Sequence, residues 1–101
     1  MTNYIYLFTR KDLSHAQQII QTAHAIHQIG AKGDKLDGIP NAVLIGVQSE
    51  KELFDVKMYL EDNEIASEIF YEPDIDAHTA IATYPIAGKQ RKRLQHFGLL
   101  Q

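Results

Sequence analysis

Two short apolar runs, each followed by a helix-start signature, constrain the fold of this chain more than any other feature. The runs are "NYIYLFT" (Asn3–Thr9), followed by Ser14 and Gln17, and "AVLIGV" (Ala42–Val47), followed by Ser49 and Glu52. Short runs rich in aromatic and β-branched residues predict buried strands. A Ser with Gln or Glu three residues later is a capping box, which predicts the start of a helix. The first part of the chain is therefore predicted to alternate strand, helix, strand, helix.

Two further strands are predicted at Ile65–Tyr71 and Thr79–Tyr84, and a short helical segment at Lys89–His96. The connection "EPDIDAH" is too short for a crossover helix, so these two strands should be antiparallel. The predicted fold is a single α/β domain over residues 1–101, in three layers with the order β-α-β-α-β-β. Its four-stranded mixed sheet has three strands in one direction and one antiparallel strand, and its crossovers are right-handed.

The helix over residues 14–30 ("SHAQQIIQTAHAIHQIG") contains no Lys, Arg, Asp or Glu. Helical periodicity gathers one apolar set on a face predicted to form core: Ala16, Ile19, Ile20, Ala23 and Ile26. The opposite face gathers amide and imidazole groups: Gln17, Gln21, His24 and Gln28. Such groups make directional hydrogen bonds without the desolvation cost of a full charge. A neutral face arising by chance, a surface buried by a second subunit and a ligand-facing surface are the three interpretations. The second helix has a predicted core stripe of Leu53, Val56 and Leu60.

Composition excludes several classes of protein. The chain has no cysteine, so disulfides and thiolate metal sites are excluded. No run of about 18 apolar residues is present, and the N-terminus lacks a signal-peptide pattern, so we expect a cytoplasmic protein without membrane contact. The net charge is −3, and acidic residues are concentrated between Glu50 and Asp76, whereas Lys89, Arg91, Lys92 and Arg93 are clustered near the C-terminus. This basic cluster is either a solvated helix or a phosphate-facing patch.

Ligands of such sheets bind beyond the carboxyl ends of the parallel strands. The predicted topology brings three segments to that edge: "RKDL" (Arg10, Lys11, Asp12), "EPD" (Asp74) and the start of the last strand (His78, Thr79). Glu72, Asp74, Asp76 and His78 alternate, which would suit an oxygen-rich metal site if the chain were extended. Because Pro and Asp favour turns, we expect a structural turn there, and no metal or other cofactor.

The pattern "YLFTRKDLS…QQIIQTAHA" resembles the N-terminal signature of the archaeal- and eukaryotic-type (type 2) peptidyl-tRNA hydrolases. The matching residues are Arg10, Asp12, Leu13, Gln21, His24 and Ala25. The segment "HTAIATYPI" is similar to that family's final strand, with Thr79 and Pro85 matching. The resemblance implies a cytoplasmic hydrolase that cuts the ester of peptidyl-tRNA without a metal and holds tRNA on a basic surface. The chain has "SHAQQII" where the family has a lysine- and glycine-rich segment with a catalytic lysine.

The residues assigned to this chemistry follow from the resemblance and the strand-end loops. The expected catalytic residues are His24, Asp74 and Thr79. Asp74, or Asp76 in its place, would act as the base or hold His78 in one tautomer, His24 would offer a second titratable group, and Thr79 would orient the water. The expected substrate-binding residues are Arg10, Lys11, Asp12, Gln17, Gln21 and His78. The first functional hypothesis is a peptidyl-tRNA hydrolase-like protein that acts on a tRNA- or nucleotide-derived ligand. The alternative is a non-catalytic binding protein, of a phage for example, that sequesters a nucleotide or a protein partner. The third option is an assembly module that forms a homodimer through the neutral helix.

Overall fold

The computed structural model describes residues 3–33 and 38–100. The segment "GDKLDGIPN" (33–41), whose Gly, Asp and Pro content predicts a loop, lies partly outside the described residues. The elements, in chain order, are β1 (Tyr4–Arg10), α1 (His15–Lys32), β2 (Asn41–Val47), α2 (Glu50–Asp62), β3 (Ser67–Glu72), the 3-10 turn η1 (Pro73–Ile75), β4 (Ala77–Thr83), α3 (Gly88–Arg91) and the 3-10 turn η2 (Lys92–Leu94). The Ser14 hydroxyl accepts from the backbone N–H of Gln17, and Ser49 does the same for Glu52, so both predicted caps are confirmed.

The strands form one mixed sheet in the order β2-β1-β4-β3. β1 pairs with β2 in parallel, with Phe8 opposite Ile45, and pairs with β4 antiparallel, with Phe8 opposite Ile81. β3 pairs antiparallel with β4 on the far side. Strands β1, β2 and β3 therefore run in one direction and β4 runs in the other, which confirms the predicted orientations.

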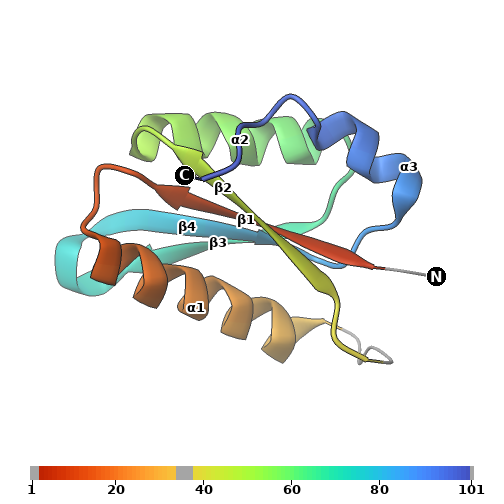
Figure 1. Cartoon of the computed structure of the whole chain (residues 1–101). Coiled ribbons are helices and arrows are strands. Elements are labelled where there is room, and N and C mark those ends of the chain that lie inside the picture. The colour runs from red at the N-terminus through yellow and green to blue at the C-terminus, as the bar shows by residue number, and fades with distance from the viewer. Residues whose placement is uncertain (1–2, 34–37, 101) are drawn as a thin grey trace.

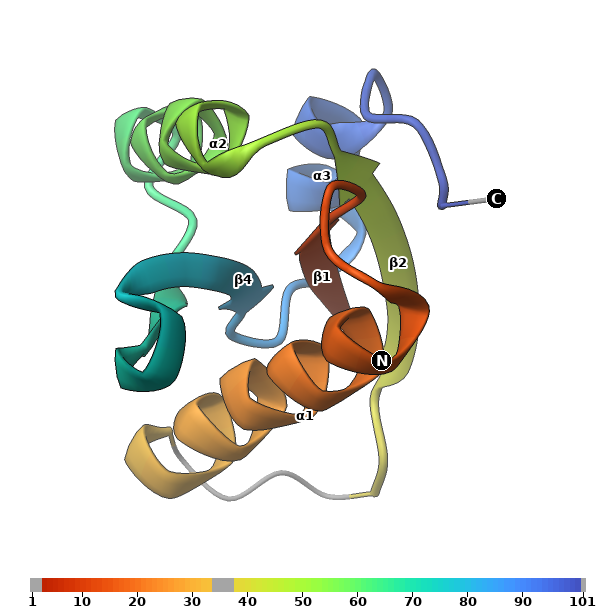
Figure 2. The same ribbon diagram turned by 90° about the vertical axis from the view of Figure 1, so that its left-hand side faces the viewer.

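Helices cover both faces of this sheet, as predicted, and Figure 1 shows the three layers. The larger core lies between the sheet and α2 together with the C-terminal turns. It contains Phe8 and Ile81 from the sheet and the predicted α2 stripe of Leu53, Val56 and Leu60, all buried. Figure 2 shows α2 and α3 next to one another on this side, with α1 on the opposite side.

The second core, under α1, combines Ile5, Leu7 and Ile29 with three alanines at the contact of α1 with β4. Ala25 of α1 meets Ala80 and Ala82 of β4, and all three are fully buried. Alanine side chains let the helix backbone approach the strand closely. Helix α1 contacts β4, β3 and β1, and the α1-facing side of the edge strand β2 is left largely uncovered.

The predicted core stripe of α1 is wrong. Ile19, Ile20 and Ile26 are 71%, 47% and 38% exposed, and Ala16 and Ala23 are also exposed. The buried residues are instead Gln18, Gln21, Ala25 and Ile29. Residues on a helix are about 100° apart, so the alanine contact turns the isoleucines away from the sheet. Periodicity identifies an apolar face correctly, but it does not say which face touches the sheet.

A cluster around Glu68 of β3 fastens the C-terminal half of α1 to the sheet. Its carboxylate accepts hydrogen bonds from Gln28 (3.1 Å), Lys32 (3.0 Å) and Tyr84 (3.0 Å). Partial burial acts to raise the pKa of Glu68, but the hydrogen bonds from Lys32, Tyr84 and Gln28 together outweigh it and hold the pKa below its ordinary value. In the part of the chain described, no helix is both long and apolar enough to cross a membrane.

We predict that Glu68→Gln lowers stability at neutral pH by about 1 kcal/mol, because the substitution removes a charge-assisted acceptor at the partly exposed surface. The folded-state pKa of Glu68 lies below its unfolded value, so its stabilisation is present above the unfolded pKa and is lost as pH falls through the folded pKa. Urea unfolding of both proteins at neutral and acidic pH tests this. The difference should disappear in acid, and a difference that is constant with pH would contradict it.

Candidate functional site

The predicted site residues of α1 lie on its buried face and on the flank over β3. Gln21 is only 2% exposed, and its amide oxygen accepts from the Thr79 hydroxyl at 3.1 Å. Its amide nitrogen donates to Gln17 at 2.9 Å. Thr79 is itself fully buried. The structure therefore brings Gln17, Gln21 and Thr79 together, in a chain of hydrogen bonds that runs from buried Thr79 through buried Gln21 to exposed Gln17.

A β-bulge in β4 puts Thr79 on this side of the sheet. Phe70 pairs with Ala80 and Tyr71 with His78, so Thr79 is the extra residue of the ladder. Thr79 thus reaches Gln21 of α1, whereas the His78 ring packs against Phe54 of α2 on the opposite side of the sheet, with centroids 4.9 Å apart. The two neighbouring residues predicted to share one site are consequently on different faces.

The predicted charged residues at the end of β1 are paired with one another. Arg10 makes a bidentate contact with Asp12, at 2.9 and 2.7 Å, and donates to the backbone carbonyl of His78 at 3.0 Å. The Arg10 hydrogen bonds lower the pKa of Asp12, and the same contact raises the pKa of Arg10. Glu50, at the start of α2, accepts from the His78 backbone N–H at 2.7 Å. These contacts among Arg10, Asp12, His78 and Glu50 lie at the carboxyl edge of the sheet, on the side of α2.

His24 lies on the flank of α1 that faces β3. Its Nδ1 is 3.7 Å from a carboxylate oxygen of Glu72, its ring is tilted over Phe70 at 4.7 Å, and its side chain is 44% exposed. This separation is within ion-pair range but longer than a hydrogen bond. Of the predicted catalytic residues, His24 and Asp74 are accessible to a substrate, whereas Thr79 is buried.

Asp74 and Asp76 lie in the turn between β3 and β4, as expected from their composition. The segment Pro73–Ile75 is a 3-10 turn, Asp76 has a left-handed φ of 48°, and the Tyr71 hydroxyl donates to Asp76, which raises the pKa of Tyr71. Asp74 is exposed, and its backbone N–H donates to Glu72. The chain is not extended here, and the described residues contain no group of three His, Asp or Glu placed to hold a metal.

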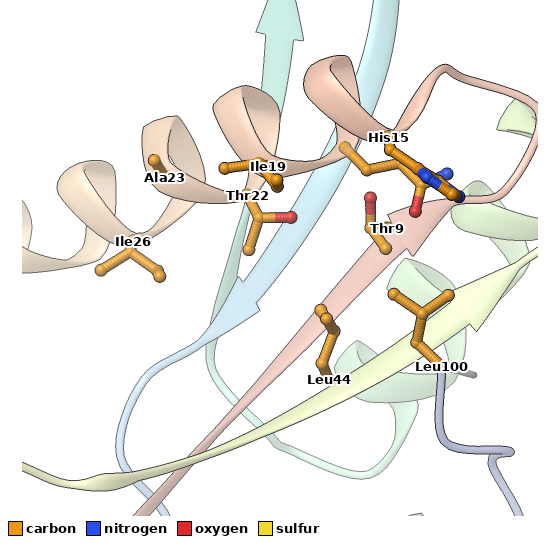
Figure 3. A pocket seen from close by; sticks show the side chains of 9 residues that line it. Thr9, His15, Ile19, Thr22, Ala23, Ile26, Leu44 and Leu100 are labelled. Atoms are coloured by element: carbon orange, nitrogen blue, oxygen red, sulfur yellow. The ribbon is translucent and has the colours of Figure 1, made fainter.

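The other flank of α1 faces an open groove over β2. Its wall is formed by Ile19, Ala23 and Ile26 of α1 and by Leu44 and Leu100, and the volume is about 480 Å³. Figure 3 shows Thr9 of β1 next to His15, and Thr22 further along α1, next to Ile19. Both hydroxyl oxygens are buried without a hydrogen-bond partner in the described residues. A buried polar atom without a partner is rare in folded proteins and is costly.

Sequence reasoning missed this groove because its residues were assigned to the core. One signal was available: Thr9 ends an otherwise apolar strand, and Thr22 falls within the apolar face of the helix. Lys11 is separated from the other predicted binding residues, because it lines the end of this groove with His15 and Gln18.

Two members of the C-terminal basic cluster are tied to the protein surface. Arg91 lies over the Tyr4 ring at 3.6 Å and donates to the Tyr6 hydroxyl at 3.0 Å. Arg93 donates to the backbone and side-chain oxygens of Asn63, both at 3.3 Å. These two arginines therefore have a structural role, and the predicted segment Lys89–His96 is split into α3 and η2.

No protein-family model matches the chain, and no curated protein matches it. Among solved structures, the chain is similar to a protein of unknown function from Agrobacterium tumefaciens strain C58, with a TM-score of 0.72 and 16% sequence identity. The similarity covers 100% of this chain and 99% of that chain. A likeness at this identity shows the fold alone, a single α/β domain with a four-stranded mixed sheet.

The unpartnered hydroxyl of Thr9 generates a stability prediction. Thr9→Val should raise the free energy of unfolding by about 1 kcal/mol, because valine has the same shape and removes a buried polar atom that has no partner. Thr83 is the matched control: it is also fully buried, but its hydroxyl accepts from the backbone N–H of Tyr6 at 2.9 Å. Thr83→Val should destabilise the protein. Urea unfolding measures both, and equal losses in the two variants would contradict the assignment.

Proposed function

We propose that this protein is a non-catalytic binding protein, and that its site for a small ligand is the groove between α1 and β2. The observation that carries the proposal is the pair of buried, unpartnered hydroxyls of Thr9 and Thr22 inside an otherwise apolar groove. Small-molecule sites combine apolar walls with a few convergent polar groups, in volumes of about 300–1,000 Å³. A groove of about 480 Å³ belongs to this class.

Exposed apolar side chains gather at the same place. Ile19 and Ile26 protrude from α1, and Leu44 protrudes from β2. Single exposed apolar residues need no explanation, but a contiguous group of them is typical of a binding surface. Covering these side chains would gain free energy from burial at about 25 cal/mol per Å². A ligand with a polar group would in addition supply the hydrogen bonds that the two threonines lack.

The residues that match the hydrolase family are less available to a ligand than the residues of this groove. Thr79 and Gln21 are hydrogen-bonded to each other, so their polar groups already have partners, whereas the hydroxyls of Thr9 and Thr22 have none among the described residues. Arg10 and Asp12 satisfy each other in the same way.

The neutral fluorophore N-phenylnaphthylamine tests the groove, because its emission rises on entering an apolar site. We predict that the wild-type protein binds it and that Ile26→Asp weakens binding about tenfold or more, because a carboxylate would then lie against the probe. Met58→Asp is the matched control, since Met58 is an exposed apolar residue of α2 on the other side of the sheet. If the wild-type protein does not bind the fluorophore, or if Ile26→Asp and Met58→Asp weaken binding equally, the proposal is overturned.

A second candidate function is hydrolysis of peptidyl-tRNA or a related ester, which the contact between His24 and Glu72 favours. The exposed imidazole is placed to activate water, with the carboxylate beside Nδ1. This candidate requires a tRNA-derived partner, which the resemblance implies.

If the protein releases peptide from peptidyl-tRNA, His24→Ala should lower the rate about 100-fold, the usual contribution of a general base. The melting temperature should change little, because the His24 side chain is half exposed. His27→Ala, an exposed histidine of the same helix, is the control and should keep the wild-type rate. Absence of release by the wild-type protein would exclude this candidate and leave the binding function.

A further inference from the structure

The groove has two unlike ends, and this asymmetry bears on the ligand. At the start of α1 it continues into a polar end lined by Lys11, His15 and Gln18, beside Leu100. At the other end Ile26 is shared with a second apolar hollow, which leads to Ile39 and Pro40. Ile39 is 97% exposed. One end of the groove is therefore cationic and hydrogen-bonding, and the rest is apolar.

The position of Lys11 depends on the glycine opposite it. Gly46 of β2 carries no side chain, and a Cβ at this position would overlap the Lys11 side chain and approach Leu100 Cδ1 to 2.9 Å. The apolar stem of Lys11 thus lies on β2 at the groove, while its backbone N–H is bound to the Val47 carbonyl at 2.7 Å. Lysine commonly packs its stem on apolar surface with the ammonium at the rim.

Within the described residues, no carboxylate forms an ion pair with Lys11. The adjacent carboxylate, Asp12, is held by Arg10 in a bidentate contact. No ion pair of Lys11 or of His15 is found among residues 3–33 and 38–100. The polar end of the groove is therefore suited to an anion.

The apolar part is long rather than compact. From His15 to Ile26 the helix advances eleven residues, which at 1.5 Å per residue is about 16 Å. Ile19, Ala23 and Ile26 follow this line on one flank, and Leu44 faces them from β2, as Figure 3 shows. Such a groove fits an extended apolar chain better than a compact ring.

We infer that the groove binds an anionic amphiphile, a carboxylate that carries an extended apolar chain. The carboxylate lies at the end formed by Lys11 and His15, where the Thr9 side chain is next to His15. The chain lies along the isoleucine flank of α1 toward Ile39. This inference rests on the proposed binding function of the groove and adds the chemical class and the orientation of its ligand.

Three probes with a straight alkyl chain of nine or ten carbons and different head groups test this inference: decanoate, n-decanol and decyltrimethylammonium, each below its micelle concentration or solubility limit. Their dissociation constants are measured by displacement of N-phenylnaphthylamine and by calorimetry. For the wild-type protein we expect decanoate to bind about fivefold more tightly than n-decanol, the scale of one partly exposed ion pair. Decyltrimethylammonium should bind most weakly.

Lys11→Met keeps the apolar stem and removes the charge. It should abolish the preference for decanoate and leave n-decanol binding unchanged. Lys89→Met removes an exposed lysine of α3, remote from the groove, and should leave both unchanged. Gly46→Ala keeps every charge but displaces Lys11, so it should reduce the preference as well. Melting temperatures of all three variants establish that they are folded.

The outcomes separate this inference from the function on which it rests. If no probe binds the wild-type protein, the groove is not a ligand site and both proposals fail. If n-decanol or the cationic probe binds as tightly as decanoate, the groove remains a binding site but the anionic class is wrong. If light scattering gives a dimer that Ile19→Asp dissociates, and no probe binds the dimer, a second copy occupies the groove and both proposals are overturned.

Discussion

The close contact between α1 and β4 through three alanines determines the rest of the molecule. Ala25 packs on Ala80 and Ala82, and none of the three retains exposed surface. Larger side chains at this contact would separate helix and strand and change the rotation of the helix. With alanine here, Ile19 and Ile26 turn toward the open side of β2, and Gln21 turns onto Thr79. Both candidate sites of the protein are consequences of this rotation.

The two flanks of α1 differ in how completely their polar groups are satisfied. On the β3 flank, Gln28 and Lys32 are bound by Glu68, and His24 is next to Glu72. On the β2 flank, the hydroxyls of Thr9 and Thr22 have no partner among the described residues. Satisfied polar groups stabilise the fold, whereas unsatisfied ones weaken it unless something binds them. The helix thus uses one flank for attachment to the sheet and leaves the other available.

The order, type and direction of the elements could be predicted from the sequence, because they depend on local signals. The caps at Ser14 and Ser49 and the short connection before β4 were sufficient for this. The rotation of α1 could not be predicted, because α1 has apolar residues on more than one face and the choice depends on alanines in a strand distant along the chain. The separation of His78 from Thr79 could have been expected, because adjacent residues of a strand point to opposite faces. The face that each of them takes was hidden, since it depends on a bulge in the pairing of β4 with β3. The expectation that the loops at the carboxyl ends of the strands meet at one edge of the sheet correctly predicted that Arg10 is near His78. It carried no information on the side of the sheet that each side chain faces.

A domain of 101 residues has a limited core, so the location of its unfavourable features is informative. Exposed isoleucines, an uncovered sheet face and unpaired buried hydroxyls each lower stability, and natural proteins retain such features mainly where function requires them. Here several of them occur on one side of the molecule, between α1 and β2, while the acidic helix α2 covers its face of the sheet with a well-packed core. Exposed apolar side chains also occur on the α2 side, at Phe54 and Met58, but the two buried hydroxyls without a partner among the described residues both lie at the groove between α1 and β2. A ligand of the proposed kind would cover the apolar wall of this groove and complete the missing hydrogen bonds at the same time.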